Sequence, residues 1–250
     1  MIFGKKHPLI ADLHVHTLSS GHAYSTIEEY ARRAKEIGLK YIAMTDHGPS
    51  MPGAPHYYHF ANLVMLPKYL YGVRILRGVE ANIVDAAGKL DLSADDLDRL
   101  DVVMVAMHPI CGYESQGEKK NTEVLLTAIE KYPQINILAH PGNPRYPIEI
   151  ETVVAFAKQK NVAIEINNSS FTGTRKGCWE RCLAFAREVK KQDWVVIIGS
   201  DSHQSLMLGT SDLAFKLLKE ADFPLNRVIN TSEKLIKKHI IERKGVGFAL

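Results

Sequence analysis

The stretch LIADLHVH, residues 9–16, is an apolar run that ends in two histidines separated by one residue. In an extended strand alternate side chains share a face, so His14 and His16 should point the same way, while Leu13 and Val15 point the other way. Two imidazoles on one face can bind a single metal ion. The stretch therefore predicts a buried strand whose carboxyl end carries metal ligands.

The same pattern recurs along the chain: short apolar runs, which we interpret as strands, end at a histidine or an acid, and helical segments separate them. We expect strands at residues 9–16, 41–44, 73–79, 102–107, 135–139, 162–166 and 194–198, with a hairpin around residues 85–88. Helical spacing predicts a helix that opens with a capping box at Ser25–Glu28 and stops at Gly38. Further helices are expected at about 121–132 and 178–190, and a helical pair at the end of the chain.

Strands that alternate with helices favour a parallel sheet covered on both faces. Such a sheet can be open and doubly wound, or closed into a barrel. Polar residues at the carboxyl ends of nearly all strands favour the barrel, because there the strand ends converge on one mouth. In an open sheet only the switch point would form a crevice. We therefore expect one α/β domain, residues 1–250, folded as a (β/α) barrel of about seven strands.

Composition excludes several classes of protein. The 250 residues are 46% hydrophobic, and the net charge of +3 is small and scattered, which does not favour nucleic acid as a partner. No apolar window approaches the roughly 18 residues of a membrane span, and no signal segment opens the chain. Three cysteines give no disulfide framework. These features predict a cytoplasmic protein with no membrane or nucleic-acid partner, and they leave an oligomer open.

Nine candidate metal ligands lie at or just after the predicted strand ends: His14, His16, His22, His47, Glu80, His108, His140, Asp201 and His203. Imidazole mixed with carboxylate suits zinc, iron or manganese better than magnesium or calcium. One ion takes about four to six ligands, so nine imply two or three ions and a bridging carboxylate. Structural histidines would be spread over the whole chain, whereas seven of the 11 gather at strand ends.

The remaining four histidines have other expected places. His7 and His239 are expected at the surface. His56 and His59 flank two tyrosines in a long loop, where they are expected to form a rim or lid rather than to bind metal.

Several divalent ions balanced by only two carboxylates would make the mouth strongly positive and attractive to an anion. Bound metal also lowers the pKa of water toward neutrality, which supplies hydroxide as a nucleophile. Phosphate ester hydrolysis uses both properties. Arg175 and Lys176 are candidates to hold the phosphate, with Asn143 and Arg145 comparable. All four could instead be solvated loop residues.

Asp12 and Asp46 precede candidate ligands in the sequence. They could orient neighbouring histidines from behind. Simple structural hydrogen bonds are the alternative. Cys178 and Cys182 lie one helical turn apart, and a structural role is favoured for both over a metal or redox role.

Five motifs, DLHVH (12–16), TDHG (45–48), GVE (78–80), HPGNP (140–144) and GSDSH (199–203), resemble those of the PHP family (polymerase and histidinol phosphatase). HAYST (22–26), LRGVEANI (76–83) and EINNSSF (165–171) resemble its YcdX-type probable phosphatases. The resemblance implies a distorted seven-stranded, TIM-like barrel. It also implies three divalent transition metal ions, usually Zn²⁺, with Mn²⁺ or Fe²⁺ as alternatives. The run Pro109-Ile110-Cys111 departs from the subgroup's pattern, which puts the nearby substrate-contacting wall in question.

By the same resemblance, three ion sites share the nine residues, and the sets are His14, His16, Glu80 and Asp201; His22, His47 and His203; and a bridging Glu80 with His108 and His140. Glu80, Asp201 and His203 would then be central to catalysis. The expected function is a metal-dependent phosphatase that acts on a small phosphorylated metabolite. Nuclease or amide hydrolysis at the same site is one alternative. A non-catalytic metal-storage or metal-sensing module is the other.

Overall fold

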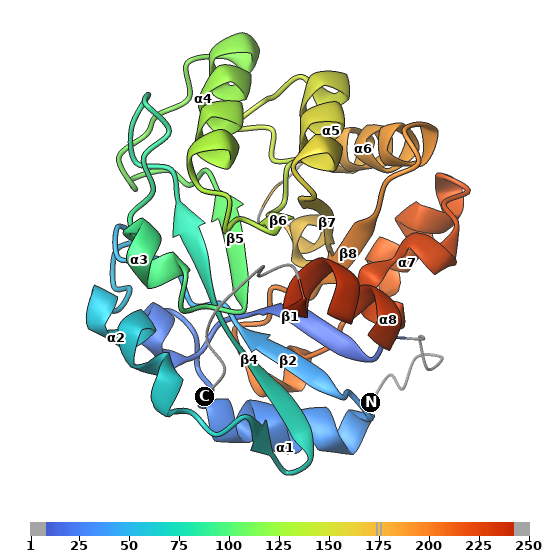
Figure 1. Cartoon of the computed structure of the whole chain (residues 1–250). Helices are drawn as coiled ribbons and strands as arrows, with labels where there is room; N and C mark the ends of the chain where they lie inside the picture. Colours follow the sequence, from blue (N-terminus) through green and yellow to red (C-terminus); the bar gives the residue numbers. More distant parts are fainter. Residues whose placement is uncertain (1–8, 174, 176, 243–250) are drawn as a thin grey trace.

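The computed structural model describes residues 9–173, 175 and 177–242. Seven parallel strands form a nearly closed barrel in the order β1-β2-β4-β5-β6-β7-β8, with helices between them (Figure 1). Their bounds are β1 (Ala11–Val15), β2 (Tyr41–Met44), β4 (Val73–Asn82), β5 (Val102–Ala106), β6 (Ile137–Leu138), β7 (Ala163–Asn167) and β8 (Val196–Gly199). Just past β8, Ser202 pairs with Val15, and the backbone amide of Asp201 donates to the carbonyl of His14 at 3.0 Å. The expected barrel is therefore confirmed.

The helices lie outside the barrel strands, and their bounds are α1 (Ile27–Ile37), α2 (Tyr57–Asn62), α3 (Ala94–Leu97), α4 (Glu118–Lys131), α5 (Ile150–Gln159), α6 (Trp179–Lys191), α7 (Asp212–Glu220) and α8 (Glu233–Ile236). The capping box of α1 is one position later than the sequence pattern predicted. Thr26 is the N-cap, and its hydroxyl and backbone amide pair reciprocally with Glu29. Ser25 instead bonds the amide of Ser205 and so ties this loop to the one after β8. Gly38 ends α1 in the left-handed conformation, as expected.

Two antiparallel additions extend β4. The predicted hairpin is confirmed, because the amide of Val84 donates to the carbonyl of Lys89 at 2.8 Å and Ile83 pairs with Leu90. The short strand β3 (Tyr69–Leu70), which was not predicted, pairs with the start of β4. β4 itself runs on to Asn82, so Glu80 lies within the strand rather than beyond its end.

Small and branched side chains from all seven barrel strands fill the interior. This inner cluster includes Ala11, Leu13, Tyr41, Ala43, Leu76, Val102, Met104, Ala106, Ile137, Ala139, Ala163, Val195 and Ile197. Ile236 of α8 and Ile229 pack against it. Layers of inward side chains of this kind make a barrel a packed core rather than a pore. The interior is therefore solid up to the level where the inner positions turn polar.

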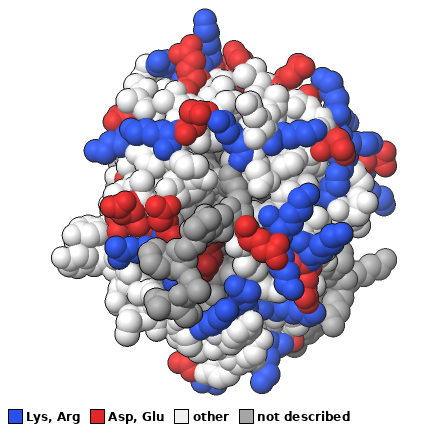
Figure 2. Space-filling model, viewed as in Figure 1, with Lys and Arg blue, Asp and Glu red and all other residues white. Residues whose placement is uncertain are grey.

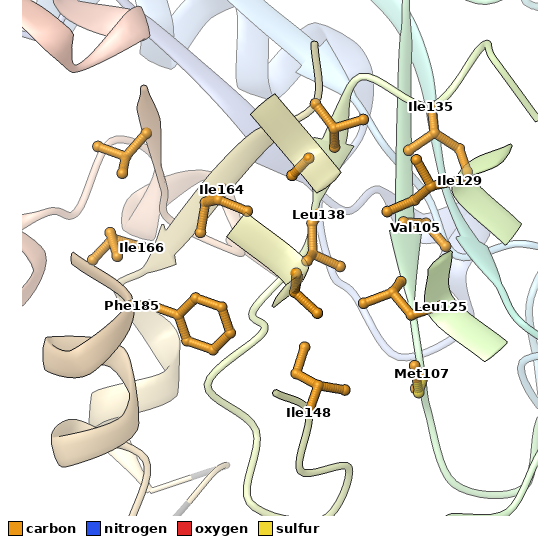
Figure 3. Close-up of a cluster of buried hydrophobic side chains, with 14 of the residues drawn as sticks. Val105, Met107, Leu125, Ile129, Ile135, Leu138, Ile148, Ile164, Ile166 and Phe185 are labelled. Atoms are coloured by element: carbon orange, nitrogen blue, oxygen red, sulfur yellow. The ribbon is translucent and has the colours of Figure 1, made fainter. Parts of the chain in front are cut away.

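A second apolar layer lies between the strands and the helices around them. In Figure 3, Val105, Leu138 and Ile164 of β5, β6 and β7 face Leu125 of α4 and Phe185 of α6. Alternate side chains of one strand thus pack in the inner cluster and in the layer beneath the helices. Both faces are buried, as the near-continuous apolar runs predicted.

The alternation predicted that Leu13 and Val15 share one face of β1, opposite His14 and His16, and for Leu13 this was wrong. Leu13 packs in the inner cluster with Ala11, while Val15 packs in the separate cluster beneath α1. The β1–β2 register shifts between Asp12 and Val15, which is an irregularity of the β-bulge type. Because of this shift, both Leu13 and the next residue, His14, can point into the barrel, which the strict alternation of a regular strand does not allow.

The expectation for His239 was also wrong, because its side chain is buried. The ring packs edge-on against Trp194, and its Nδ1 lies 3.0 Å from the amide oxygen of Asn161. His7 lies outside the described residues. Among the residues that the structure describes, no helix has the length and apolar character to cross a membrane.

Candidate metal centre

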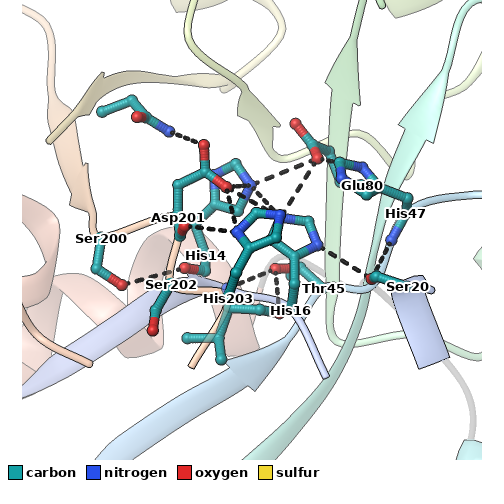
Figure 4. Close-up of polar contacts among 12 residues, drawn as sticks. His14, His16, Ser20, Thr45, His47, Glu80, Ser200, Asp201, Ser202 and His203 are labelled. Carbon is teal, nitrogen blue, oxygen red and sulfur yellow. Dashed lines mark hydrogen bonds and ion pairs between the residues drawn. The ribbon is translucent and has the colours of Figure 1, made fainter. Parts of the chain in front are cut away.

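The inner rows of the barrel turn polar at the carboxyl ends of the strands. In β2 the row passes from Ala43 to Thr45 and His47, and in β5 it passes from Ala106 to His108. In β8 it passes from Ile197 through Gly199 to Asp201. Because the seven barrel strands are parallel, these polar ends gather at one mouth (Figure 4).

The structure brings all nine predicted side chains together. Neighbouring rings connect them, with centroids 4.2 Å apart for His16 and His47 and 5.1 Å apart for His108 and His140. His22, the one exposed member, lies in the loop after β1 and still stacks 5.0 Å from His47. Residues that are nearly 190 positions apart in the chain therefore share one cluster.

Glu80 stands at the centre of this cluster and is fully buried. Its Oε1 lies 2.6 Å from Nε2 of His140 and 3.5 Å from Nε2 of His108. Its Oε2 lies 2.8 Å from Nδ1 of His47 and 3.5 Å from Nε2 of His14. One carboxylate thus faces histidines from four other strands or strand ends.

Side-chain nitrogen and oxygen atoms of the cluster lie within hydrogen-bond distance of one another, and two of them are left without a hydrogen bond. Nε2 of His14 and Nε2 of His16 are 3.1 Å apart. Nδ1 of His47 and Oε2 of Glu80 lie 2.8 Å apart, yet neither atom makes a hydrogen bond with any described residue. Buried polar atoms without a partner are costly, and an ion that all of them can bind removes that cost. The donor set, imidazole with carboxylate, fits divalent zinc, iron or manganese.

The pKa values reflect the burial and the crowding of the cluster. Burial together with the neighbouring His47 lowers the pKa of His16 to about 3, so this ring is neutral and has a lone pair available at neutral pH. Burial also acts against the charge of His14, but the carboxylates of Glu165, Asp201 and Glu80 outweigh it and raise its pKa well above the usual value. Burial likewise opposes ionisation of Glu80, and the surrounding histidines overcome it and hold its pKa well below the usual range.

Two of the nine residues have backbone conformations that L-residues rarely adopt. His140 has φ of 31° and Asp201 has φ of 53°. Such strain costs of the order of 1–3 kcal/mol per residue and gathers at functional sites. Both residues directly follow the inner rows of β6 and β8, so the strain turns their side chains toward the cluster.

Among the residues that the structure describes, three groups of donor atoms lie close enough to hold an ion: His16, His47 and His203; His14, His16 and Asp201; and His47, Glu80 and His108. The first two resemble two of the sets that the family resemblance implied. In the third, His47 takes the place expected for His140, which instead pairs with Glu80 at 2.6 Å. The division of the nine residues among ions therefore stays a prediction.

Polar residues behind the cluster hold several rings. Asp46 accepts a hydrogen bond from the hydroxyl of Ser20, which lies 3.3 Å from Nδ1 of His16. The amide oxygen of Asn82 lies 2.8 Å from Nδ1 of His108. Asp12 instead accepts from the backbone amides of Ser200 and Gly209, which is the structural alternative.

Sequence reasoning gave no role to two inward residues of β7, Glu165 and Asn167. Glu165 is buried, with Oε1 2.7 Å from Nδ1 of His14 and Oε2 2.7 Å from the backbone nitrogen of His140. The amide nitrogen of Asn167 lies 3.2 Å from Oδ2 of Asp201. Their period-2 spacing at a strand end is the same signal that identified His14 and His16, and it could have identified this pair.

Of the described residues predicted to contact phosphate, Arg175 bonds Asp201 of the cluster, whereas Asn143 and Arg145 bond each other. Its guanidinium lies 3.2 Å from Oδ2 of Asp201 and 3.2 Å from the hydroxyl of Ser170. Lys176 lies outside the described residues. Asn143 caps the amide of the exposed Arg145 within its own loop.

Two histidines of the long loop after β2 lie in or next to the short helix α2. His56 is the N-cap of α2. Nε2 of His59 lies 3.2 Å from Oδ2 of Asp46, behind the cluster. His59 therefore belongs to the support of the site.

Comparison with known proteins identifies the family. The family model described as PHP domain matches residues 12–169. A "Probable phosphatase" of Acetivibrio thermocellus is 48% identical over 235 residues, covering 94% of this chain and 96% of the relative. A "Probable phosphatase" of Shewanella loihica is 43% identical over 239 residues, covering 95% and 96%.

A solved structure of histidinol phosphate phosphatase from Lactococcus lactis, complexed with zinc, L-histidinol and phosphate, has a TM-score of 0.59. It is 17% identical and covers 86% of this chain and 94% of its own, so it supports the fold alone. The matched residues 12–169 include seven of the nine side chains, all but Asp201 and His203. The chain belongs to the PHP domain family and is an enzyme of the hydrolase class.

Proposed function

We propose that residues 1–250 form one metal-dependent phosphatase domain that hydrolyses a small phosphomonoester at the nine-residue cluster. The observation that carries the proposal is the buried pair of unpartnered atoms, Nδ1 of His47 and Oε2 of Glu80, within a cluster that the guanidinium of Arg175 reaches at Asp201. The names of the relatives, "Probable phosphatase", support the same reaction.

In this proposal His14, His16, His22, His47, Glu80, His108, His140, Asp201 and His203 hold three divalent ions, with zinc first and manganese or iron as alternatives. Such ions supply positive charge and a hydroxide nucleophile at neutral pH. Glu80 bridges between ion positions because its two oxygens face different histidines. Two carboxylates leave most of the positive charge of three ions unbalanced, and that charge draws an anionic substrate to the mouth.

Arg175 is the proposed phosphate contact. The guanidinium has a fork of donors, and only part of it is used by Ser170 and Asp201. A phosphate oxygen at the mouth can take the remaining donors. Because Arg175 also lies beside Asp201, it can orient the ester relative to the candidate ion positions.

The small, scattered net charge of +3 favours a small ester over a nucleic acid as the substrate. On the face where α8 lies, Lys and Arg are interspersed with Asp and Glu (Figure 2). The Lactococcus lactis structure contains histidinol and phosphate, which supports a small phosphorylated metabolite here. Three free cysteines support the cytoplasmic assignment.

The test is turnover of the purified protein after metal removal and reloading with Zn²⁺, Mn²⁺ or Fe²⁺. p-Nitrophenyl phosphate and a panel of phosphorylated metabolites serve as substrates, with a phosphodiester and an amide as controls. Phosphate release that depends on added metal and favours monoesters is the expected result. Faster cleavage of the diester or amide, or metal binding without any turnover, would contradict the proposal.

Arg175→Ala tests the phosphate contact, with Arg145→Ala as the matched control from another mouth loop. Losing hydrogen bonds to a charged group costs about 1.5–3 kcal/mol, which raises KM roughly 10- to 150-fold. Metal content measured alongside separates this effect from a change at Asp201. A rise in KM for the Arg145 variant alone would move the phosphate contact to the loop after β6.

A further inference from the structure

We propose that Glu165 is a positioning residue that fixes the ring of His14 for metal binding and ties it to the loop that carries His140. β7 is the one barrel strand without a candidate ligand, yet its inward residues at the mouth are Glu165 and Asn167. Both are buried and polar. The inference rests on the proposal that the cluster holds metal.

The contact with His14 determines which ring nitrogen is available. Nδ1 of His14 lies 2.7 Å from Oε1 of Glu165. Oε2 of the same carboxylate already accepts from the backbone amide of His140 at 2.7 Å and from Asn167 at 3.2 Å, so the group acts as an acceptor. Nδ1 must therefore carry a proton, which leaves Nε2, facing His16, Glu80 and Asp201, as the nitrogen that an ion can bind.

The contact with His140 holds a strained turn. His140 has φ of 31°, and its amide donates to Oε2 of Glu165. Without that acceptor a buried amide would lose its partner, which costs about 1–3 kcal/mol, and the strained backbone would lose its support. The ring of His140 contacts Glu80, so a shift of this turn would reach the centre of the cluster.

The neighbouring strand is shaped to accept the carboxylate. A Cβ placed on Gly199 of β8 would lie 2.0 Å from Oε1 of Glu165 and 2.9 Å from Cβ of His14. Gly199 therefore leaves the space in which these two side chains meet. Asn167 extends the same arrangement to β8, since its amide group bridges Glu165 and Asp201.

The two contacts require a carboxylate rather than any polar group of similar shape. Glu165 offers two acceptor oxygens to two donors that lie on different strands. Glutamine has one acceptor oxygen, so an amide at this position must turn its NH₂ group toward either Nδ1–H of His14 or N–H of His140. Glu165→Gln thus keeps the volume and breaks one of the two contacts.

The experiment measures the zinc affinity of Glu165→Gln by competition with a chelator. The matched control is Asp101→Asn. Asp101 lies just before β5, away from the mouth, and its carboxylate accepts hydrogen bonds from Arg77. We expect zinc to bind about 10- to 100-fold more weakly to the Glu165 variant, as is usual for residues that orient metal ligands. The control should bind zinc as the unaltered protein does, and thermal melts report the fold of each variant.

A second measurement needs no variant. In the zinc-loaded protein, the imidazole ¹⁵N shifts of His14 should show a protonated Nδ1 and a metal-bound Nε2. A protonated Nε2, or unchanged zinc affinity in folded Glu165→Gln, would overturn the role of Glu165 while leaving the proposed function in place. An unaltered protein that binds no zinc, manganese or iron would overturn both.

Discussion

Replacing Glu80 with glutamine removes one of two oxygens that face separate groups of histidines. Oε1 faces His140 and His108, and Oε2 faces His47 and His14. Glutamine offers one carbonyl oxygen, and its NH₂ group cannot bind a metal ion. The variant should therefore lose at least one of the three proposed ions, whichever way the amide turns.

The loss of rate follows from the loss of preorganised charge. Removing one such group from a hydrolytic site typically lowers kcat by about 10²–10³, or about 2.7–4 kcal/mol. Metal per chain is measured by inductively coupled plasma mass spectrometry, and kcat with p-nitrophenyl phosphate. Glu130→Gln, on the exposed face of α4, is the control because it changes charge in the same way far from the mouth.

The Glu80→Gln substitution should also lower the stability of the metal-free protein. Glu80 is fully buried and its pKa is held well below the usual range, so its charge stabilises the fold above its unfolded pKa. Removing one member of a buried ionic cluster costs about 3–5 kcal/mol. A Glu80→Gln protein with the metal content and kcat of the unaltered protein would refute the bridging role.

Three further predictions concern protons, a thiol and a helix cap. Because the carboxylates that outweigh the burial of His14 raise its pKa, we expect the metal-free ring to carry a second proton, on Nε2, at neutral pH. An ion that binds Nε2 should release that proton, and affinity should then rise with pH up to the raised pKa. Calorimetry in buffers of different ionisation enthalpy measures the release, and equal heats would contradict it. Burial raises the pKa of Cys111 to about 12, so iodoacetamide at pH 8 should alkylate this thiol only after unfolding. Mass spectrometry follows the alkylation, and rapid labelling of the folded protein would contradict the prediction. Thr26→Ala should lower stability by about 1 kcal/mol and the melting temperature by roughly 2–4 °C without changing kcat; an unchanged melt would mean that the capping box adds nothing.

The site was predictable from the sequence because it follows from topology. In a parallel barrel the carboxyl ends of all strands meet, so histidines and acids at strand ends have to lie together. His108 and His140, 32 positions apart in the chain, accordingly lie with ring centroids 5.1 Å apart. His22, in a loop, also lies beside these rings, with its centroid 5.0 Å from that of His47.

The predictions that were wrong or missing concern local geometry, which hydrophobic periodicity and composition do not reveal. The register shift in β1 turned Leu13 inward, although alternation predicted the other face. His239 was expected at the surface, but its ring is buried and packs against Trp194. Glu165 was missed because it lies inside the predicted strand, whereas the other candidate ligands were sought at or just after the strand ends.

The most direct test of the account is anomalous diffraction from crystals of the metal-loaded protein, recorded at the absorption edge of the bound metal. We predict anomalous peaks inside the mouth of the barrel, bounded by His16, Glu80, His140 and Asp201. Peaks only at the surface, or none within the cluster after incubation with zinc, manganese and iron in turn, would contradict it.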